Sequence, residues 1–346
     1  MSDSAAFLRA NAALFRCPSC RADGQLQVDA GGATVACAAC STVYPITDGL
    51  PQLFAPNDDW EGDKSDITES MKAFYEKTPF PNYDGFDDAA ALVQKAKQGF
   101  FARLLDEQTP FGAKIVECGC GTGQLSNFLG VGNNRVVVGL DLCLNSLRLA
   151  NGFKQRNKLN NTRFFQANLF RPPLCEGSFD YVISNGVLHH TSDPKLAFHT
   201  IAKLAKPGGY VLVGLYHQYG RLWTDLRRWI FRVGGDKFKF LDPRTLSQRI
   251  SAEKREAWFQ DQYKNPHESK HTIGEVIDWL DEAGLEFVKS VPKAMPFESF
   301  SANEKLFDAD ARPEGAARTL AEMLMTFNNA REGGFFIVIA RKPANG

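Results

Sequence analysis

Four cysteines near the N-terminus have the spacing of a metal site. They form two Cys-x-x-Cys pairs, CPSC and CAAC, separated by sixteen residues: Cys17, Cys20, Cys37 and Cys40. Each pair can direct two thiolates toward one ion, so this spacing predicts a tetrahedral zinc site. The alternative, a redox dithiol, needs a single pair within a β-α-β unit. Because four protein ligands complete the coordination of the ion, we expect a structural zinc.

The sequence around these cysteines indicates a small β domain. Gly31 and Gly32 stand between two strand-like runs and predict a hairpin turn. About fifty residues bury too little apolar surface to fold alone, so the metal is expected to supply much of the folding energy. CPxC, CxxC and YPI-DG-P occur in order over residues 15–55. This segment resembles the zinc ribbon that activates eukaryotic tRNA and protein methyltransferases, and the N-terminal ribbon of a bacterial ribosomal-RNA guanine methyltransferase.

A second group of chemically informative residues surrounds a glycine-rich turn. The run VECGCGTGQLS places Gly119, Gly121 and Gly123 between a strand-like and a helix-like segment. Glycines allow a sharp turn and a close approach of the backbone to a ligand. The dinucleotide pattern GxGxxG does not fit, because Gln124 and Ser126 stand where its third glycine is required.

Polar residues end the strand-like runs that follow. Asp141 closes VVVGLD, 22 residues after Gly119, where an acid can accept two hydrogen bonds from a ribose diol. Asn168 follows the third run, and Asn185 and Gly186 close the fourth. Taken alone, Asp141, or Glu117 at the end of the first run, is more simply explained as a helix cap. Because the carboxyl ends of parallel strands meet at one edge of a sheet, the set together predicts a ligand crevice.

These motifs, in this order, resemble those of the class I S-adenosylmethionine-dependent methyltransferases. The resemblance covers about residues 113–215 and the final strand pair, and the first motif, E-x-G-x-G-x-G, runs from Glu117 to Gly123. Asn168 departs from the family, which usually has Asp there to accept from the adenine amino group. The resemblance implies S-adenosylmethionine as cofactor, held by ten residues: Glu117, Gly119, Gly121, Gly123, Asp141, Leu142, Asn168, Leu169, Asn185 and Gly186.

Strand-like and helix-like runs alternate from residue 113 onward, beginning with AKIVEC and QLSNFL. This alternation predicts an α/β fold with a doubly wound parallel sheet. The resemblance implies a seven-stranded Rossmann-like sheet with helical insertions, preceded by the β zinc ribbon. The expected segments are the ribbon (1–55), a linker with N-terminal helices (56–112), the S-adenosylmethionine-binding core (113–215), a helical insertion that covers the substrate (216–271), and the completion of the core (272–346) with a second insertion at about 292–331.

Helices are expected on either side of the ribbon. Apolar spacing predicts two of them over 67–77 and 87–107, after a polar linker at 56–66. The turn-rich stretch TPFPNYDGF between them is either an apolar contact between the helices, which we favour, or an aromatic lid over a pocket. The first sixteen residues lack a clear signal-peptide cleavage site and predict a short amphipathic helix.

The first insertion is both basic and aromatic. Between Arg221 and Arg255 it holds ten Lys or Arg against four Asp or Glu, with Trp223, Trp229 and Phe231 interleaved. This composition fits either a surface for RNA, a phosphorylated substrate or anionic lipid, or an amphipathic helix whose aromatic residues face the core. We favour the second interpretation, because the whole chain carries no net charge.

A dense polar cluster ends this insertion. It comprises five residues within eleven positions: Asp261, Tyr263, His267, Glu268 and His271. The cluster fits a metal site or a general base, and it fits equally well a loop whose polar groups cap helices. Pro266 interrupts the spacing, so a helical HExxH site is excluded.

Two features indicate which kind of group accepts the methyl: several histidines, and the absence of a motif typical of amine methyltransferases. A hydroxyl acceptor has to lose a proton during methyl transfer, and histidine can take it near neutral pH. The candidates are, in order of preference, His190, His217 and His267, with His189 beside the first. SNGV stands where exocyclic-amine methyltransferases have an NPPY-type tetrad. The sequence therefore favours an oxygen or carbon nucleophile on a small-molecule acceptor.

Composition limits the other function classes. Forty Lys or Arg balance forty Asp or Glu, which argues against a polyanion-binding design across the whole protein. No apolar run reaches the length of a membrane span. We expect a cytoplasmic protein, in which the eight cysteines serve as ligands, catalysts or packing groups and only rarely as disulfide partners. Two alternatives to the small-molecule enzyme remain: an RNA-modifying methyltransferase that uses the ribbon and the basic insertion, and a non-catalytic module that binds S-adenosylmethionine for regulation.

Overall fold

The computed structural model describes residues 1–57, 67–77, 79, 83, 88–132, 134–242, 245, 251–328 and 333–344. The expected linker at 56–66 and the turn-rich stretch at 78–86 lie mostly outside these residues. The expected N-terminal helix and the helix at 67–77 are both present, as α1 (Asp3–Ala10) and α2 (Thr68–Lys77).

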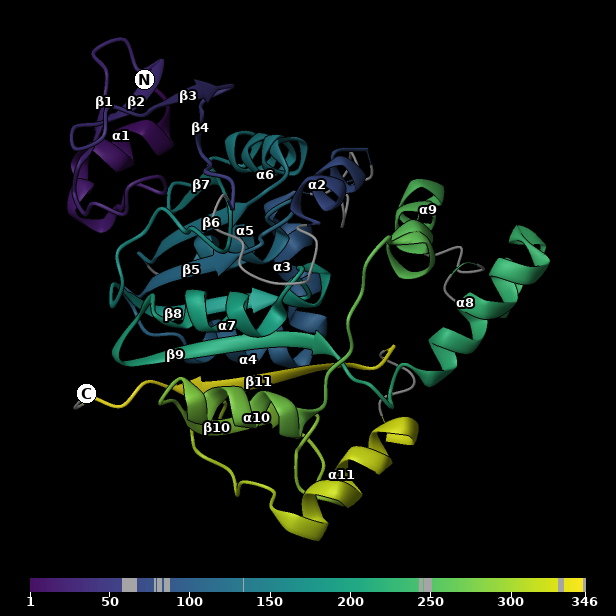
Figure 1. The fold of residues 1–346 in the computed structure, drawn as a ribbon. Helices are drawn as coiled ribbons and strands as arrows, with labels where there is room; N and C mark the ends of the chain where they lie inside the picture. Colours follow the sequence, from purple (N-terminus) through teal and green to yellow (C-terminus); the bar gives the residue numbers. More distant parts are fainter. Residues whose placement is uncertain are drawn as a thin grey trace.

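Seven strands form the central sheet, in the order β7-β6-β5-β8-β9-β11-β10 (Figure 1). Neighbouring strands are parallel from β7 to β9, whereas β11 runs antiparallel to both β9 and β10. This is the doubly wound α/β sheet that the sequence predicts, and β11 and β10 complete it with antiparallel pairing. Its strands are β5 (Lys114–Cys118), β6 (Val136–Asp141), β7 (Thr162–Ala167), β8 (Phe179–Asn185), β9 (Ala205–Tyr216), β10 (Glu286–Val291) and β11 (Phe335–Arg341).

The ribbon extends this sheet rather than standing apart from it. Its strands are β1 (Leu26–Val28), β2 (Thr34–Cys37), β3 (Val43–Thr47) and β4 (Leu50–Leu53). β4 pairs in parallel with β7, so in the described part of the chain the hydrogen-bonded sheet has eleven strands instead of seven. Leu8, Phe15 and Val35 belong to the same apolar cluster as Val116 of β5. The ribbon therefore gains apolar burial from the core, in addition to any stabilisation by a metal.

Helices cover both faces of the sheet, because successive strand residues point to opposite sides. Ile115 packs with the helices α3 to α6, and its neighbour Val116 packs with α7 and α10. Gly119 to Gly123 lead from β5 into α5 at the edge where both layers meet. These helices are α3 (Ala89–Gln98), α4 (Phe100–Gln108), α5 (Gln124–Val131), α6 (Leu144–Arg156), α7 (Pro194–Ala202) and α10 (Ile273–Glu282).

The single helix predicted over 87–107 is wrong, because the chain forms two helices there. Gly99 ends α3 and begins α4, with φ −88° and ψ 123°. Glycine has a low helix propensity and a flexible backbone. Leaving the helical conformation at Gly99 therefore costs little free energy. The break allows Leu92 of α3 and Leu105 of α4 to reach the same apolar cluster. The apolar spacing predicted the buried faces of both helices but not the break between them at Gly99.

The insertions lie beyond the sheet. The first contains α8 (Leu222–Gly234), η3 (Asp236–Leu241), α9 (Ala252–Phe259) and η4 (Gln260–Lys264), and the second ends in α11 (Gly315–Asn328). Figure 1 shows α8 and α9 on the right, past the carboxyl ends of the parallel strands. Within the described residues, no helix has the length and apolar character needed to cross a bilayer.

The aromatic residues of α8 do not all face the core, and this corrects the interpretation that we favoured. Phe231 is buried as expected, but the exposed fractions of Trp223 and Trp229 are 49% and 62%. The helix is amphipathic in the sense predicted, yet two of its largest apolar side chains are in solvent. Sequence spacing could not show this, because α8 carries apolar residues on more than one face.

Candidate functional site

A cavity of about 450 Å³ opens at the carboxyl ends of the parallel strands. It lies beyond the neighbouring strands β5 and β8, after which the chain continues to β6 on one side and to β9 on the other, the position at which doubly wound sheets bind ligands. The polypeptide after β5, β6, β7 and β8 contributes to its wall. Nine of the ten predicted cofactor residues line it: Glu117, Gly119, Gly121, Asp141, Leu142, Asn168, Leu169, Asn185 and Gly186.

Two carboxyl groups face this cavity from neighbouring strands. Asp141 accepts hydrogen bonds from the backbone N–H groups of Gly121 (2.7 Å) and Cys143 (2.8 Å). Withdrawal from bulk water raises the pKa of Asp141 to about 6. Glu117 accepts a hydrogen bond from the Ser126 hydroxyl, and its burial raises the pKa of Glu117 to about 8. Each carboxylate oxygen retains acceptor capacity for a ligand.

The glycine turn is shaped by tight packing. Gly119 has φ +80°, and a Cβ there would lie 2.4 Å from Cγ1 of Val187, which lines the cavity from the other side. Gly123 has φ +73°, and its Cβ would lie 2.7 Å from Cβ of Ala150. Gly123 is the predicted cofactor residue outside the cavity lining. It permits the packing of α5, whereas Gly119 and Gly121 form the cavity floor.

Comparison with known proteins agrees with this geometry. A family model described as "Methyltransferase domain" matches residues 116–213. Residues 116–213 form an S-adenosylmethionine-dependent methyltransferase domain. The family resemblance inferred from motif order is thereby confirmed.

The methyltransferase domain has relatives with assigned names. The ubiquinone biosynthesis O-methyltransferase of Erwinia tasmaniensis is 28% identical over 178 residues, which cover 51% of this chain and 62% of the relative. The demethylmenaquinone methyltransferase of Oceanobacillus iheyensis is 34% identical over 103 residues, covering 29% and 43%. A solved S-adenosylmethionine-dependent methyltransferase from Mesorhizobium loti has 18% identity and a TM-score of 0.44, over 71% of this chain and 99% of that one. The chain spans less than two thirds of the length of these two curated relatives.

Asn168 of the methyltransferase domain connects the cavity to the ribbon. Its amide donates to the carbonyl oxygen of Ala55 (3.1 Å) and to Oδ1 of Asn57 (2.7 Å), both just after β4. Its Oδ1 accepts from the backbone N–H of Phe170 (3.0 Å). The amide is therefore engaged, and a ligand amino group would have to use the second lone pair of the carbonyl oxygen.

His190 is the one predicted histidine whose side chain lines the cavity. Its Nδ1 lies 2.8 Å from the carbonyl oxygen of His267. A carbonyl can only accept, so Nδ1 carries the proton and Nε2 of the neutral ring has a free lone pair. Burial lowers the pKa of His190, which favours this neutral form.

The other two candidate histidines have different places. His217 is buried outside the cavity lining, and its Nε2 lies 2.5 Å from a carboxylate oxygen of Glu322. Its Nδ1 is the acceptor for two backbone N–H groups, so the ring is fully used in holding the chain. His267 contributes its carbonyl oxygen to His190. His189 is fully buried, and neither ring nitrogen has a hydrogen-bond partner within the described residues.

Three further polar residues line the cavity near His190: Tyr75 and Tyr216, which were not selected from the sequence, and Asp261, which was. The Tyr75 hydroxyl donates to Oδ1 of Asp261 (3.1 Å), and Gln262 Nε2 donates to its Oδ2 (2.9 Å). Burial raises the pKa of Asp261. Asp261 belongs to the predicted polar cluster, but the two tyrosines come from α2 and the end of β9, and no spacing relates them.

The other members of the polar cluster at 261–271 have separate partners in the structure. Tyr263 donates to Asp242 (2.9 Å), Glu268 pairs with Arg221, and His271 contacts Glu275. In the described parts of the chain, the N-terminal cysteines are the one group of His, Cys, Asp and Glu arranged to hold a metal. The cluster thus divides between side-chain contacts to other elements and the cavity wall.

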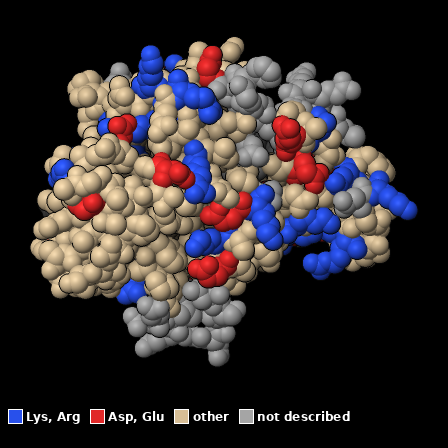
Figure 2. Space-filling view, turned by 90° about the horizontal axis from the view of Figure 1, so that it is seen from above, with Lys and Arg blue, Asp and Glu red and all other residues tan. Residues whose placement is uncertain are grey.

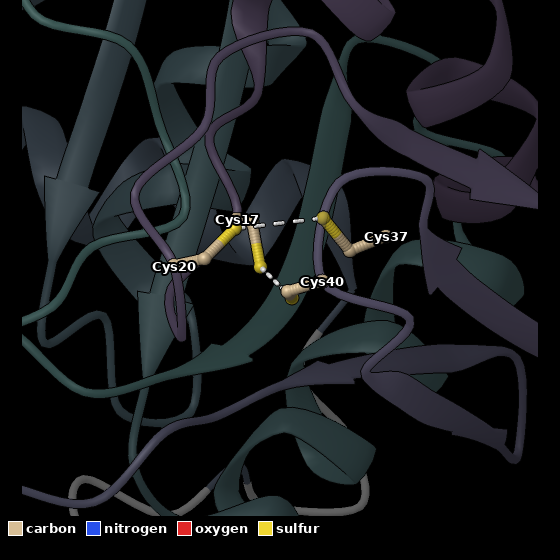
Figure 3. A group of neighbouring side chains, drawn as sticks. All are labelled: Cys17, Cys20, Cys37 and Cys40. Carbon is tan, nitrogen blue, oxygen red and sulfur yellow. Dashed lines mark hydrogen bonds between the residues drawn. The ribbon is translucent and has the colours of Figure 1, made fainter.

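The four N-terminal thiols converge from two turns of the ribbon (Figure 3). All their sulfur atoms lie within 4.8 Å of one another. The Sγ atoms of Cys17 and Cys40 are 3.8 Å apart, and those of Cys20 and Cys37 are 3.7 Å apart. Four sulfurs at about 2.3 Å from one tetrahedral Zn²⁺ would be about 3.8 Å apart. The donor set and its spacing therefore fit this ion.

Proposed function

We propose that the chain transfers a methyl group from S-adenosylmethionine to a small-molecule acceptor, at an oxygen or a carbon nucleophile. The observation that carries the proposal is one cavity lined by two unlike groups of residues. The glycine turn and two carboxyl groups form the first, which we call the cofactor end, and His190, Tyr75 and Asp261 form the second, which we call the acceptor end.

The first end suits the nucleoside cofactor. Asp141, one strand away from the glycine turn, would accept from the ribose hydroxyls, as carboxylates at this position of Rossmann-type sheets do. Glu117 is held largely protonated by burial, and a cationic amino group nearby would favour its ionised form. Leu142 and Leu169 supply apolar contacts for the base. Asn185 and Gly186 would face the amino-acid end.

The second end suits proton removal from an acceptor. S-adenosylmethionine supplies an electrophilic methyl carbon on a sulfonium, whose C–S bond breaks as the new bond forms and leaves its electron pair on sulfur. Nε2 of neutral His190 would take the proton that a hydroxyl acceptor loses. The contact between Nδ1 and the His267 carbonyl fixes the ring and its tautomer. Tyr75, Tyr216 and Asp261 would orient the acceptor.

One of the named relatives favours the oxygen nucleophile. The relative from Erwinia tasmaniensis is a ubiquinone biosynthesis O-methyltransferase, and its name states the atom class that it methylates. An oxygen acceptor also gives His190 a role that a pre-ionised acceptor would not need. An RNA acceptor would instead have to splay a nucleotide into this cavity, and its base would meet the Asp261 carboxyl at the far end.

We further propose that Cys17, Cys20, Cys37 and Cys40 hold one structural zinc ion. The short sulfur-to-sulfur distances support four thiolate ligands, which leave no coordination position for a substrate. The ion would fix the two turns that begin and end the β1–β2 hairpin. This site is separate from the cavity and takes no part in methyl transfer.

The decisive experiment follows a labelled methyl group. The full chain is incubated with S-adenosylmethionine labelled in the methyl group and with a cell extract that has been separated into RNA and small molecules. We expect label in the small-molecule fraction. The double variant Glu117→Ala, Asp141→Ala should bind no cofactor by calorimetry and transfer no label.

The matched control is Glu107→Ala, which removes an exposed carboxylate of α4 that pairs with Arg103. It should behave as the unaltered chain does. Label that appears in RNA would replace the small-molecule proposal with RNA modification. Tight cofactor binding with no labelled fraction would indicate the regulatory module.

A further inference from the structure

The described surface exposes large apolar side chains unevenly. Nineteen are exposed in the described residues, and nine of them fall between residues 219 and 241. This stretch comprises α8, η3 and the turn before them. The nine are Tyr219, Leu222, Trp223, Leu226, Trp229, Val233, Phe238, Phe240 and Leu241. Isolated exposed apolar residues are ordinary, but a concentrated group of this kind marks an interaction surface.

Four of these side chains form a stripe along α8, at successive spacings of four, three and four residues, which places them on one helix face. This α8 stripe consists of Leu222, Leu226, Trp229 and Val233. Their exposed fractions run from 46% to 71%. Trp223 flanks the stripe, and the aromatic residues of η3 extend it.

The opposite face of α8 already has its packing partners. Phe231 is 3% exposed and meets the rings of Phe259 (5.6 Å between centroids) and Tyr263 (4.7 Å). Thr224 is buried on the same side. The helix is therefore held to α9 and η4 without the stripe, and the exposed apolar residues are not needed to attach it to the protein.

Positive charge borders the stripe. Arg232 and Lys237 are exposed beside it, and the stretch from Arg221 to Arg255 holds ten Lys or Arg against four Asp or Glu in a chain with no net charge. Figure 2 shows Lys and Arg gathered at the right of the molecule, on the side where Figure 1 places α8. The surface thus combines aliphatic, indole and cationic groups.

We propose that α8 and η3 dock the protein on the surface of a membrane that contains anionic lipids. Aliphatic side chains would enter the boundary of the acyl chains, indoles would lie at the headgroup level, and Arg232 and Lys237 would meet lipid phosphates. α8 has thirteen residues and is about 20 Å long, so it lies along the interface and does not cross the bilayer. This inference is independent of the methyl acceptor.

The charge border favours a membrane over two other occupants. A second copy of the chain, paired through the same surface, would bring two basic borders together, which opposes association. Single-stranded RNA stacks on aromatic rings, but Leu222, Leu226 and Val233 offer it no ring. An anionic lipid surface satisfies the aliphatic and the basic groups together.

The test measures sedimentation of the full chain with vesicles. Vesicles of phosphatidylcholine are compared with vesicles of phosphatidylcholine and phosphatidylglycerol. We expect binding to the anionic vesicles, weaker binding to the neutral ones, and a blue shift of tryptophan fluorescence. The variant Trp223→Ser, Trp229→Ser should bind anionic vesicles about tenfold more weakly or worse, because two indoles leave the interface.

Matched controls keep the test specific. Phe111→Ser and Phe297→Ser remove aromatic rings that are 74% and 83% exposed elsewhere on the surface. These variants should bind vesicles as the unaltered chain does, and thermal unfolding should be unchanged in all four substitutions. Arg232→Glu with Lys237→Glu should abolish the preference for anionic over neutral vesicles.

Three outcomes would overturn the proposal. The first is equal vesicle binding, or none, by the unaltered chain and the Trp223→Ser, Trp229→Ser variant. The second is a dimer in analytical ultracentrifugation that this variant loses, which would assign the surface to a second copy. The third is salt-sensitive RNA binding that needs Arg232 and Lys237 but neither tryptophan.

Discussion

At the residue scale, the cavity depends on Asp141 in two ways. Its carboxylate already accepts from the N–H groups of Gly121 and Cys143, and so holds the glycine turn against the end of β6. The same oxygens would accept from a ribose. Asp141 thus has a structural role and a binding role. Its ionisation should therefore affect the empty protein as well as the complex with the cofactor.

Cofactor affinity should therefore depend on pH through Asp141. Burial raises its pKa to about 6, so below that pH the carboxyl is protonated and binding must also remove a proton. Apart from a separate rise near pH 8 that Glu117 contributes, affinity measured by calorimetry should increase in one step as pH rises through about 6. The variant Asp141→Asn should bind about ten- to a hundredfold more weakly, because it loses charge-assisted hydrogen bonds, and should lack this step in affinity.

The same shift has the opposite sign for the empty protein. A carboxyl whose pKa is raised on folding favours the folded state at low pH, and this contribution is lost as pH rises from about 4 to about 6. Denaturant unfolding of the empty chain at two pH values checks the sign. If Asp141→Asn and the unaltered chain show the same pH dependence of both affinity and stability, Asp141 is not the titrating group.

His190 makes a separate prediction for turnover. The variant His190→Gln should reduce kcat by about a hundredfold to ten-thousandfold while cofactor affinity stays unchanged, because the ring takes a proton only during transfer. Burial lowers the pKa of His190 below its ordinary value of 6.5, so activity should fall only when pH drops below that value. This acid limb should be absent in the variant. His217→Gln is a contrasting variant that should lower stability through Glu322 and leave the acid limb in place.

The sequence could indicate which residues lie together at the cofactor end of the cavity but not which lie together at the acceptor end, for a physical reason. Glu117, Gly119 and Asp141 lie at strand ends whose order along the chain fixes their meeting point in the sheet. Tyr75 and Asp261 come from segments far apart in the chain and meet only through tertiary packing. No spacing encodes that contact, and the choice among His190, His217 and His267 depended on it too.

At the element scale, the ribbon is coupled to the cavity through β4. This strand pairs with β7, and the two residues that receive the Asn168 amide, Ala55 and Asn57, follow it directly. The sequence predicted the ribbon and the sheet separately. It could not predict their pairing, because a contact of only two residue pairs between strands has no signature that specifies the neighbour.

Metal removal should consequently affect both elements. Chelation of the zinc, or the variant Cys17→Ser, Cys20→Ser, should lower the Tm by about 5 °C or more, because the two turns lose their common ligand. Cofactor affinity should fall as well, since β4 positions the partners of Asn168. Thermal unfolding, calorimetry and elemental analysis of zinc per chain measure these three quantities.

Cys175→Ser is the matched control for this experiment, because Cys175 is a partly exposed cysteine outside the cluster. It should retain one zinc per chain and an unchanged Tm. A chain that contains no zinc as isolated, or whose Tm is the same with and without chelator, would contradict the structural metal. Loss of Tm without loss of cofactor affinity would instead limit the role of zinc to the ribbon.

At the scale of the whole molecule, charge is balanced in total and uneven in place. Forty basic residues equal forty acidic ones, yet the first insertion concentrates basic groups. Charged groups also occur in the interior, where they are paired. Arg221 and Glu268 form a fully buried ion pair at the base of α8, and Arg221 stacks over Tyr216 (3.7 Å to the ring centroid), which lines the cavity. One buried pair thus joins the insertion to the wall of the acceptor end.

Breaking this pair should separate the two ends of the cavity functionally. In the variant Glu268→Gln, the guanidinium of Arg221 stays buried without its counter-charge, which should cost about 3 kcal/mol of unfolding free energy. Cofactor affinity should not change, because β5 and β6 hold that end. The KM for the acceptor should rise, because Tyr216 and Asp261 lose their fixed positions. Glu256→Gln, which removes an exposed partner of Lys239, should cost about 0.5 kcal/mol or less and leave KM unaltered. A loss of cofactor affinity equal to the rise in KM would mean that the insertion supports the whole cavity and not its acceptor end alone.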